Sequence, residues 1–310
     1  MLHHHYLTLM ADYSLNHRLE YYLTFSLTAF FRAMPVSWAV RLGMGIGWLA
    51  YKMLGIRRKV MLENLKQAFP EKTDAERRKI AVKAYSHWGG MGAEFAILPK
   101  LGDSYFKKYV TIEGLDVLDK VVTGGIGGIN IAGHLGNWEV MGAACTQNGY
   151  EVTYVVANQS NKLIDKMMDD HRRAHNLEIW KTREAPRGIL KSLKKNRFVA
   201  LMIDQDAGRE CVFVDFFGKE ASTHRGPAVF HLKTGSPFIL STCVRTKGIH
   251  YKIMFEEVNL EIPEGSTEEK TISIMAKLTK LLEEKVRQYP EQYFWMHKRW
   301  KTKRPEGVKV

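Results

Sequence analysis

The sequence has little cysteine and no uninterrupted apolar run long enough to cross a membrane. Its three cysteines, Cys145, Cys211 and Cys243, are odd in number and lie apart among apolar residues. This predicts small core residues in a reducing compartment, not disulfides or metal ligands. A spanning helix needs about 20 consecutive apolar residues, and the most hydrophobic region, residues 21–54, is broken by Arg32 and Pro35. Residues 1–20 also lack the compact apolar core of a cleavable signal peptide.

Several common motifs are absent as well. The glycines of residues 124–128 precede an apolar stretch instead of following it, which excludes a dinucleotide fingerprint. No Lys-Ser/Thr pair follows Gly133, so a phosphate loop is absent too. No Gly-x-Ser-x-Gly is present for a serine hydrolase. His171 and His175 share one face of an expected helix and could hold a metal, but the arginines between them favour a solvated basic surface. We therefore expect no metal and no cofactor.

Acidic residues are outnumbered by basic ones, 33 to 46, which gives a formal net charge of +13. Such an excess indicates an anionic partner: nucleic acid, an acidic membrane surface or an acidic carrier. Residues 21–54, followed by the basic residues 57–59, predict two amphipathic helices seated in the membrane interface. A single tilted span and a pair of buried core helices are the alternatives.

The chain predicts three parts: an N-terminal helical, membrane-associating segment (1–56), a helical region packed on the core (57–109) and an α/β core (110–310). Thr73, with Glu76 three residues later, predicts a capped helix start after Pro70. From residue 110 onward, short apolar runs alternate with helical patterns, which predicts an α/β fold with a mixed, largely parallel sheet flanked by helices. The expected strands are 110–112, 128–132, 152–157, 198–203, 238–244 and 251–255. The expected helices are 139–147, 163–175, 186–195, 227–234 and 268–287. The basic tail from Lys298 is expected to be a ragged end.

The stretch around His134 carries the most specific chemical signal. The apolar run 129–132 stops at Gly133, His134 follows, and Glu139 stands in the first turn of the next helix. This spacing predicts a general base with a carboxylate that holds its other ring nitrogen. The alternative is a loop histidine beside an acid at a helix N-terminus.

Other polar residues are expected near the same edge of the sheet or at helix starts. Asp204, Gln205 and Asp206 follow the run 198–203, and sites gather at the carboxyl ends of parallel strands. Arg183 precedes one expected helix and Arg225 another, where an anionic group could bind.

These motifs together make the chain, over roughly residues 20–304, resemble the lipid A biosynthesis (late) acyltransferases, which add lauroyl or myristoyl chains. They belong to the broader glycerolipid acyltransferase group with a His-x4-Asp/Glu signature. The resemblance rests on the following blocks: Arg58-x5-Asn64-Leu65-x2-Ala68-Phe69-Pro70-Glu71, His134-x-Gly136-Asn137-Trp138-Glu139, Asp204-Gln205-Asp206-x-Gly208, Phe213-Val214-Asp215-Phe216-Phe217, Gly226-Pro227-Ala228, and Pro290-Glu291-Gln292-Tyr293-x-Trp295-x-His297-x-Arg299-Trp300-Lys301. The family usually has one membrane-associated helix, and here that region is interrupted.

The resemblance implies a glycerolipid acyltransferase-like fold at the cytoplasmic face of a bacterial inner membrane. It implies acyl transfer from an acyl thioester, on acyl carrier protein or coenzyme A, to a hydroxyl of a lipid A precursor. His134 would be the general base, Glu139 would fix its tautomer, and the backbone near His134 or Arg183 would stabilise the oxyanion. No Ser or Cys lies in a nucleophile motif, so transfer is expected without an acyl-enzyme. The residues expected to bind substrate are Asn137, Arg183, Asp204, Gln205, Asp206 and Arg225.

Three alternatives stay open. The acceptor could be another glycolipid, an aminolipid such as ornithine lipid, or a lysophospholipid, because specificity depends on pocket shape. A basic nucleic-acid-binding protein would interleave aromatics with basic residues, as residues 297–304 do locally, although the apolar N-terminus argues against nucleic acid. An inactive paralogue is disfavoured by intact His134 and Glu139. We expect a monomer.

Overall fold

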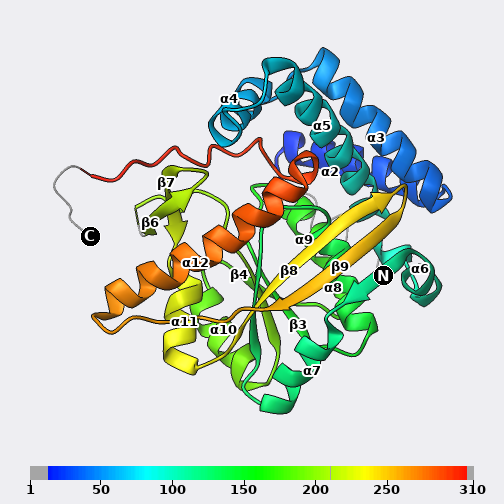
Figure 1. Cartoon of the computed structure of the whole chain (residues 1–310). Helices are drawn as coiled ribbons and strands as arrows, with labels where there is room; N and C mark the ends of the chain where they lie inside the picture. The colour runs from blue at the N-terminus through cyan, green and yellow to red at the C-terminus, as the bar shows by residue number, and fades with distance from the viewer. Residues whose placement is uncertain (1–12, 210, 306–310) are drawn as a thin grey trace.

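A computed structural model of the protein describes residues 13–209 and 211–305. Its centre is a seven-stranded sheet with the strand order β1-β9-β8-β2-β5-β3-β4 (Figure 1). Strands β8, β2, β5, β3 and β4 are mutually parallel, β9 is antiparallel to β8, and β1 is parallel to β9. The predicted α/β fold with a mixed, largely parallel sheet is therefore confirmed. The bounds of these strands are β1 Val110–Glu113, β2 Gly128–Ala132, β3 Val152–Val156, β4 Glu178–Lys181, β5 Phe198–Met202, β8 Phe238–Lys247 and β9 His250–Glu257.

Helices cover both faces of this sheet. The core on one face contains side chains of α10, α11 and α12, and the core on the other contains side chains of α6, α7 and α8. Strand β2 is buried along its whole length and supplies Ile129 and Ile131 to the first core and Ala132 to the second. Burial on both faces explains why the strand is apolar apart from Asn130, whose buried side chain accepts a hydrogen bond from Ser241 Oγ. The helix bounds are α6 Asp103–Tyr109, α7 Leu115–Gly124, α8 Trp138–Gln147, α9 Lys162–Arg173, α10 Ala185–Lys194, α11 Gly226–Thr234 and α12 Thr267–Gln288, with short 3-10 turns at Leu98–Lys100 and Pro290–Gln292.

Four N-terminal helices form a group at one end of the sheet (Figure 1). They are α2 Leu15–Arg32, α3 Val36–Met53, α4 Arg58–Ala68 and α5 Asp74–Ile97. The Thr73–Glu76 capping box starts α5 as predicted. Helix α3 packs tightly on α5, since a Cβ added at Gly47 would lie 2.1 Å from the carbonyl oxygen of Tyr85.

The break between α2 and α3 falls at residues 33–35, as the sequence predicts. Within the described ranges, no helix has the length and apolar character needed to cross a bilayer. Both helices nevertheless expose large apolar side chains: Leu15, Leu19, Leu23 and Phe30 on α2, and Trp38, Ile46, Trp48 and Met53 on α3. The first 12 residues of the predicted N-terminal segment lie outside the described residues.

The sequence patterns missed four elements. These are helix α7, the edge strand β4, and the two strands of a hairpin, β6 Cys211–Phe216 and β7 Lys219–His224. The hairpin has a two-residue turn at Phe217 and Gly218, and a Phe at this position gives no turn signal.

The expectation of a ragged tail from Lys298 is wrong for the described part of the tail. Arg299 is buried, and its guanidinium donates to the backbone carbonyl of Ser222 and to Thr223 Oγ1. Arg304 is paired with Glu220 at 2.7 Å. The described part of the tail is therefore fastened to the β6–β7 hairpin through Arg299 and Arg304.

Candidate active site

The loop after β2, residues 133–137, is held rigidly by neighbouring segments. The N–H of Gly136 donates to the carbonyl of Gln292 at 3.0 Å, and the N–H of Asn137 donates to that of Cys243 at 2.9 Å. Gly136 has φ +66°, and a Cβ there would lie 1.7 Å from the Cys243 carbonyl oxygen. Only glycine satisfies both the left-handed backbone and this close approach, so the loop fixes the position of the preceding histidine.

Asp204, which follows β5, contacts both the backbone and the ring of His134. One carboxylate oxygen accepts the His134 backbone N–H at 2.9 Å, and the other lies 2.8 Å from ring Nδ1. Strands β2 and β5 are adjacent and parallel, so their carboxyl ends bring the two residues together. A proton on Nδ1, donated to Asp204, leaves Nε2 with a lone pair. The pair therefore has the geometry of an oriented general base.

The charges around His134 favour its protonated form. Burial alone would lower the pKa of His134, but the charge and hydrogen bond of Asp204 and the charge of Glu139 outweigh it, and the pKa is raised above 6.5. Burial raises the pKa of the Asp204 carboxyl, but the charge and hydrogen bonds of His134 and the charge of Arg299 together lower it below the usual value. Asp204 is thus an anion that can stabilise an imidazolium.

The predicted contact between Glu139 and His134 is corrected by the structure. Glu139 is buried in the first turn of α8, on the side facing α9, and its carboxylate accepts from Arg172 Nη2 at 2.6 Å and from Arg172 Nε at 3.1 Å. Trp138 Nε1 donates to the same carboxylate at 3.1 Å. Both oxygens of Glu139 are engaged by Arg172, while Asp204 takes the ring nitrogen that the sequence assigned to Glu139. Glu139 acts on His134 through its charge.

Replacing Arg172 with methionine is expected to destabilise the protein by about 3 kcal/mol, because a buried carboxylate would lose its partner. Arg172→Lys keeps the charge but loses the bidentate contact, and it should lower the free energy of unfolding by less. The double variant Arg172→Met/Glu139→Gln should recover much of the loss. Denaturant unfolding measures all three variants. Equal stability of Arg172→Met and the wild type would show that the pair contributes nothing.

The other predicted site residues are distributed unevenly around His134. The amide Nε2 of Gln205 lies 3.3 Å from His134 Nε2, so this residue is at the site. Asp206 accepts from the backbone N–H and hydroxyl of Thr302, at 3.0 and 2.9 Å, and so binds the C-terminal tail. Asn137 is buried, and its side chain caps α8 and donates to Glu94. These contacts make Asp206 and Asn137 parts of the frame that holds the loop.

The two predicted arginines lie outside this constellation. Arg225 is paired with Glu268 at 2.6 Å on the surface. Arg183 is exposed in the turn between β4 and α10. Neither residue lines the cavity beside His134.

That cavity has a volume of about 220 Å³ and a largely apolar wall. Strands β2, β3 and β5 and helix α8 supply apolar side chains to it, and His134, Gln159 and Arg172 contribute polar groups. Its apolar lining residues include Trp138, Met141, Tyr154, Val155, Val156 and Met202. Such a cavity beside a base suits a hydrocarbon chain attached to a reacting carbonyl.

An aromatic cluster that the sequence did not reveal packs around the imidazole. The ring of Trp138 lies 4.9 Å from His134 and that of Phe294 lies 6.1 Å away, measured between centroids. Trp88 of α5 contacts both aromatic rings, at 5.4 and 4.6 Å. These three residues come from distant parts of the chain, so no local pattern could have identified them.

The expectation that His171 and His175 lie on a solvated surface is wrong. Both are buried against the end of α5: ring nitrogens lie 3.1 Å from the Phe95 carbonyl for His171 and 2.7 Å from the Leu98 carbonyl for His175. Burial and the charge of Arg32 lower the pKa of His171 to about 4. Their packing role explains the pair without a ligand, and the described residues hold no group of three or more side chains suited to a metal ion.

Comparison with known proteins gives a consistent picture. The family model for the bacterial lipid A biosynthesis acyltransferases matches residues 11–302. The lipid A biosynthesis lauroyltransferase of Escherichia coli (strain K12) is 29% identical over 280 residues, 89% of each chain. The palmitoleoyltransferase of the same organism is 29% identical over 269 residues, 86% of this chain and 85% of its own. A phosphatidylinositol mannoside acyltransferase of Mycobacterium tuberculosis (strain CDC 1551 / Oshkosh) is 29% identical over 136 residues, 43% of each chain.

Proposed function

The chain belongs to the bacterial lipid A biosynthesis acyltransferase family, and from this premise we propose that it moves a fatty acyl chain from a thioester to a hydroxyl of a lipid A precursor. The donor is acyl carrier protein or coenzyme A charged with the chain. The observation that carries the mechanism is the Asp204–His134 contact at 2.8 Å beside the apolar cavity.

In the proposed reaction, His134 Nε2 removes the proton of the acceptor hydroxyl as its oxygen attacks the thioester carbonyl. Asp204 holds Nδ1–H and stabilises the imidazolium that forms. The tetrahedral intermediate then collapses, the C–S bond breaks, and the imidazolium returns its proton to the leaving sulfur. No residue is acylated. The acyl chain occupies the cavity between β3, β5 and α8, where its apolar surface is removed from water.

The backbone of the loop is a poor source of oxyanion donors, contrary to the prediction from sequence. The N–H groups of residues 134–137 donate, in order, to Asp204 and to the carbonyls of Gly133, Gln292 and Cys243. This leaves the Gly133 N–H and nearby side chains as the candidate donors. The amide of Gln205 is placed next to the reacting nitrogen and is better situated than Arg183.

The test is acyl transfer by the detergent-solubilised full chain. Lauroyl and myristoyl carrier protein and the matching coenzyme A thioesters are the donors, and a tetra-acylated lipid A precursor is the acceptor, with products identified by mass spectrometry. A product one acyl chain heavier supports the proposal. The mycobacterial relative, whose name specifies a mannoside, motivates a second panel of glycolipid, aminolipid and lysophospholipid acceptors. Transfer only to that panel would overturn the lipid A assignment.

We also propose that α2 and α3 seat the enzyme in the interface of the inner membrane, facing the cytoplasm. The support is their exposed apolar side chains, such as Leu23 at 74%, Trp38 at 67% and Met53 at 73% exposure, followed by the basic residues 57–59. An interfacial helix binds through buried apolar area and through attraction to anionic lipid.

The double variant Trp38→Glu/Met53→Glu is expected to lower binding to vesicles containing phosphatidylglycerol several-fold, because each charge opposes burial of the apolar face. Flotation with vesicles measures the bound fraction. Val122→Glu, at an exposed apolar position on α7, is the matched control and should bind as the wild type does. Equal binding by all three proteins would exclude α2 and α3 as the membrane contact.

A further inference from the structure

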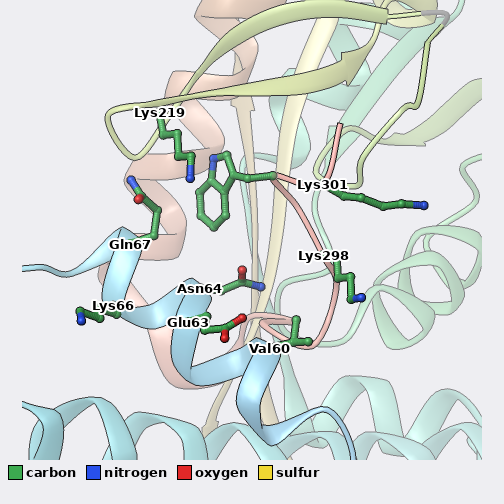
Figure 2. A pocket seen from close by; sticks show the side chains of 9 residues that line it. Val60, Glu63, Asn64, Lys66, Gln67, Lys219, Lys298 and Lys301 are labelled. Atoms are coloured by element: carbon green, nitrogen blue, oxygen red, sulfur yellow. The ribbon is translucent and has the colours of Figure 1, made fainter. Parts of the chain in front are cut away.

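A second hollow, larger than the catalytic cavity, lies where α4, the β6–β7 hairpin and the C-terminal tail meet (Figure 2). Its volume is about 590 Å³. Lys66 comes from α4, Lys219 from the hairpin, and Lys298 and Lys301 from the tail. Figure 2 shows Lys219 extending into the hollow from the hairpin above α4. Within residues 13–209 and 211–305, none of the four ammonium groups has an ion pair or a hydrogen bond.

A buried donor in the same wall lacks a partner. Trp300 lines the hollow, and its indole Nε1 is shielded from solvent and makes no hydrogen bond to the described residues. Its ring is held by Phe216 at 5.9 Å. Buried N–H groups are nearly always paired in folded proteins, so this unpaired one is a donor in the wall of a hollow that four lysines line.

The backbone that carries Lys219 is strained and firmly held. Phe217, two residues earlier, has φ +56°, a region that side chains other than glycine adopt at a cost. Its N–H donates to the buried Glu283 at 2.6 Å, and its ring packs on Phe69 and Trp295. A two-residue hairpin turn with positive φ at both Phe217 and Gly218 requires this conformation, so the turn fixes the start of the strand that carries Lys219.

The wall of the hollow is also hydrogen-bonded to the loop that carries Asp204 to Asp206. Asn64 of α4 donates to the backbone carbonyls of Trp295 and His297, at 2.8 and 2.6 Å. The ring of His297 accepts the backbone N–H of Asp206 at 2.9 Å, and Thr302 binds the Asp206 carboxylate. One tail segment thus forms the hollow and fastens the loop that carries Asp204 to Asp206.

We propose that this hollow binds the phosphate group of a phosphorylated substrate, with Lys219 as its contact and the shielded Trp300 N–H opened to it by side-chain movement on binding. A phosphate offers several acceptor oxygens and carries one to two negative charges, which suits multiple ammonium groups and an N–H donor. The phosphate belongs either to the pantetheine arm of the acyl donor or to the sugar of the acceptor. The assignment of the phosphate to the donor or to the acceptor rests on the proposed function, whereas the existence of the anion site does not. Glu63, the acid that the described residues contribute to the wall, limits the affinity.

Isothermal titration of the full chain at low ionic strength tests the site. The probes are coenzyme A, glucosamine 1-phosphate and inorganic phosphate, with pantetheine and glucosamine as phosphate-free counterparts. We expect a phosphorylated probe to bind about tenfold more tightly than its counterpart, equivalent to about 1.4 kcal/mol. Preference for coenzyme A assigns the site to the donor, preference for glucosamine 1-phosphate assigns it to the acceptor, and equal binding of all three assigns it to free phosphate.

Substitutions in the wall of the hollow are expected to change the affinity for phosphate in opposite directions. Lys219→Gln should weaken binding several-fold and Glu63→Gln should strengthen it, while Lys247→Gln, at an exposed lysine on β8, should leave it unchanged. Trp300→Phe removes the donor together with part of a packed ring and should also weaken binding, with thermal unfolding as a check that the variant is folded.

Two outcomes would overturn the site: no phosphorylated probe binds better than its counterpart, or Lys219→Gln and Lys247→Gln behave alike. Acyl transfer is assayed on the same preparations. A preparation that transfers acyl chains but shows no preference for phosphate overturns the site alone, and one that binds phosphate but transfers nothing overturns the proposed reaction alone.

Discussion

Replacing His134 with alanine is expected to lower kcat/KM for acyl transfer by a factor of about 10²–10⁴, the range that a positioned general base contributes. The acceptor hydroxyl holds its proton far above neutral pH, and no other described base has the position of His134 between Asp204 and the apolar cavity. The side chain is partly open, at 21% exposure, so its removal should leave the fold intact.

The measurement is initial rate against acceptor concentration, with thermal unfolding as a check on folding. His250→Ala, at an exposed histidine at the start of β9, is the matched control and should keep the rate of the wild type. Comparable rates for His134→Ala and His250→Ala would remove His134 from the chemistry and move the search for the base to another residue.

Asp204→Asn is expected to reduce kcat by a similar factor, about 10²–10⁴, although the side chain keeps its size. A carboxylate accepts both the His134 backbone N–H and the Nδ1 proton. An asparagine offers one acceptor and one amide donor, so it can present an N–H to the ring and favour the tautomer whose Nε2 carries the proton. That tautomer cannot accept a proton from the alcohol.

Asp206→Asn is the control in the same loop, because Asp206 binds the tail and does not contact the ring. It should lose far less activity than Asp204→Asn. If the two variants lose activity equally, the loop acts as a frame and Asp204 has no special role as the orienting carboxylate.

Local patterns were sufficient to predict six of the seven strands of the main sheet and to single out His134 as the candidate base. Strand β2 is buried on both faces and reads as an apolar run, and Gly133 marks its end. The capping box at Thr73 identified the start of α5 from four residues. Both features depend on neighbours in the chain, which is the kind of information that periodicity carries.

The carboxylate partner of His134 could not be inferred in this way. Glu139 is five residues from His134, whereas Asp204 is 70 residues away and becomes adjacent only because β2 and β5 pair in register. Which acid contacts His134 depends on which side of α8 faces α9. Glu139 lies on that side and is paired with Arg172 of α9. Sequence spacing alone favoured the nearer acid.

A similar limit explains the misread basic segments. Arg172 and His171 look solvated in sequence but pack under α5, and Arg299 is buried against the β6–β7 hairpin. Charged side chains in a run are exposed by default, and only the fold shows which have partners. Lys219, by contrast, stays unpaired and lines a hollow.

The measurement that bears most directly on the Asp204–His134 pair is the pH dependence of kcat/KM for the wild type and Asp204→Asn. Only neutral His134 can accept the proton, so the rate of the wild type should rise with pH through a midpoint above 6.5, because the His134 pKa is raised. Removing the charge of Asp204 should move that midpoint to lower pH while the plateau falls. Coincident midpoints would contradict the assignment, and a shift seen only with Glu139→Gln would return the orienting role to Glu139.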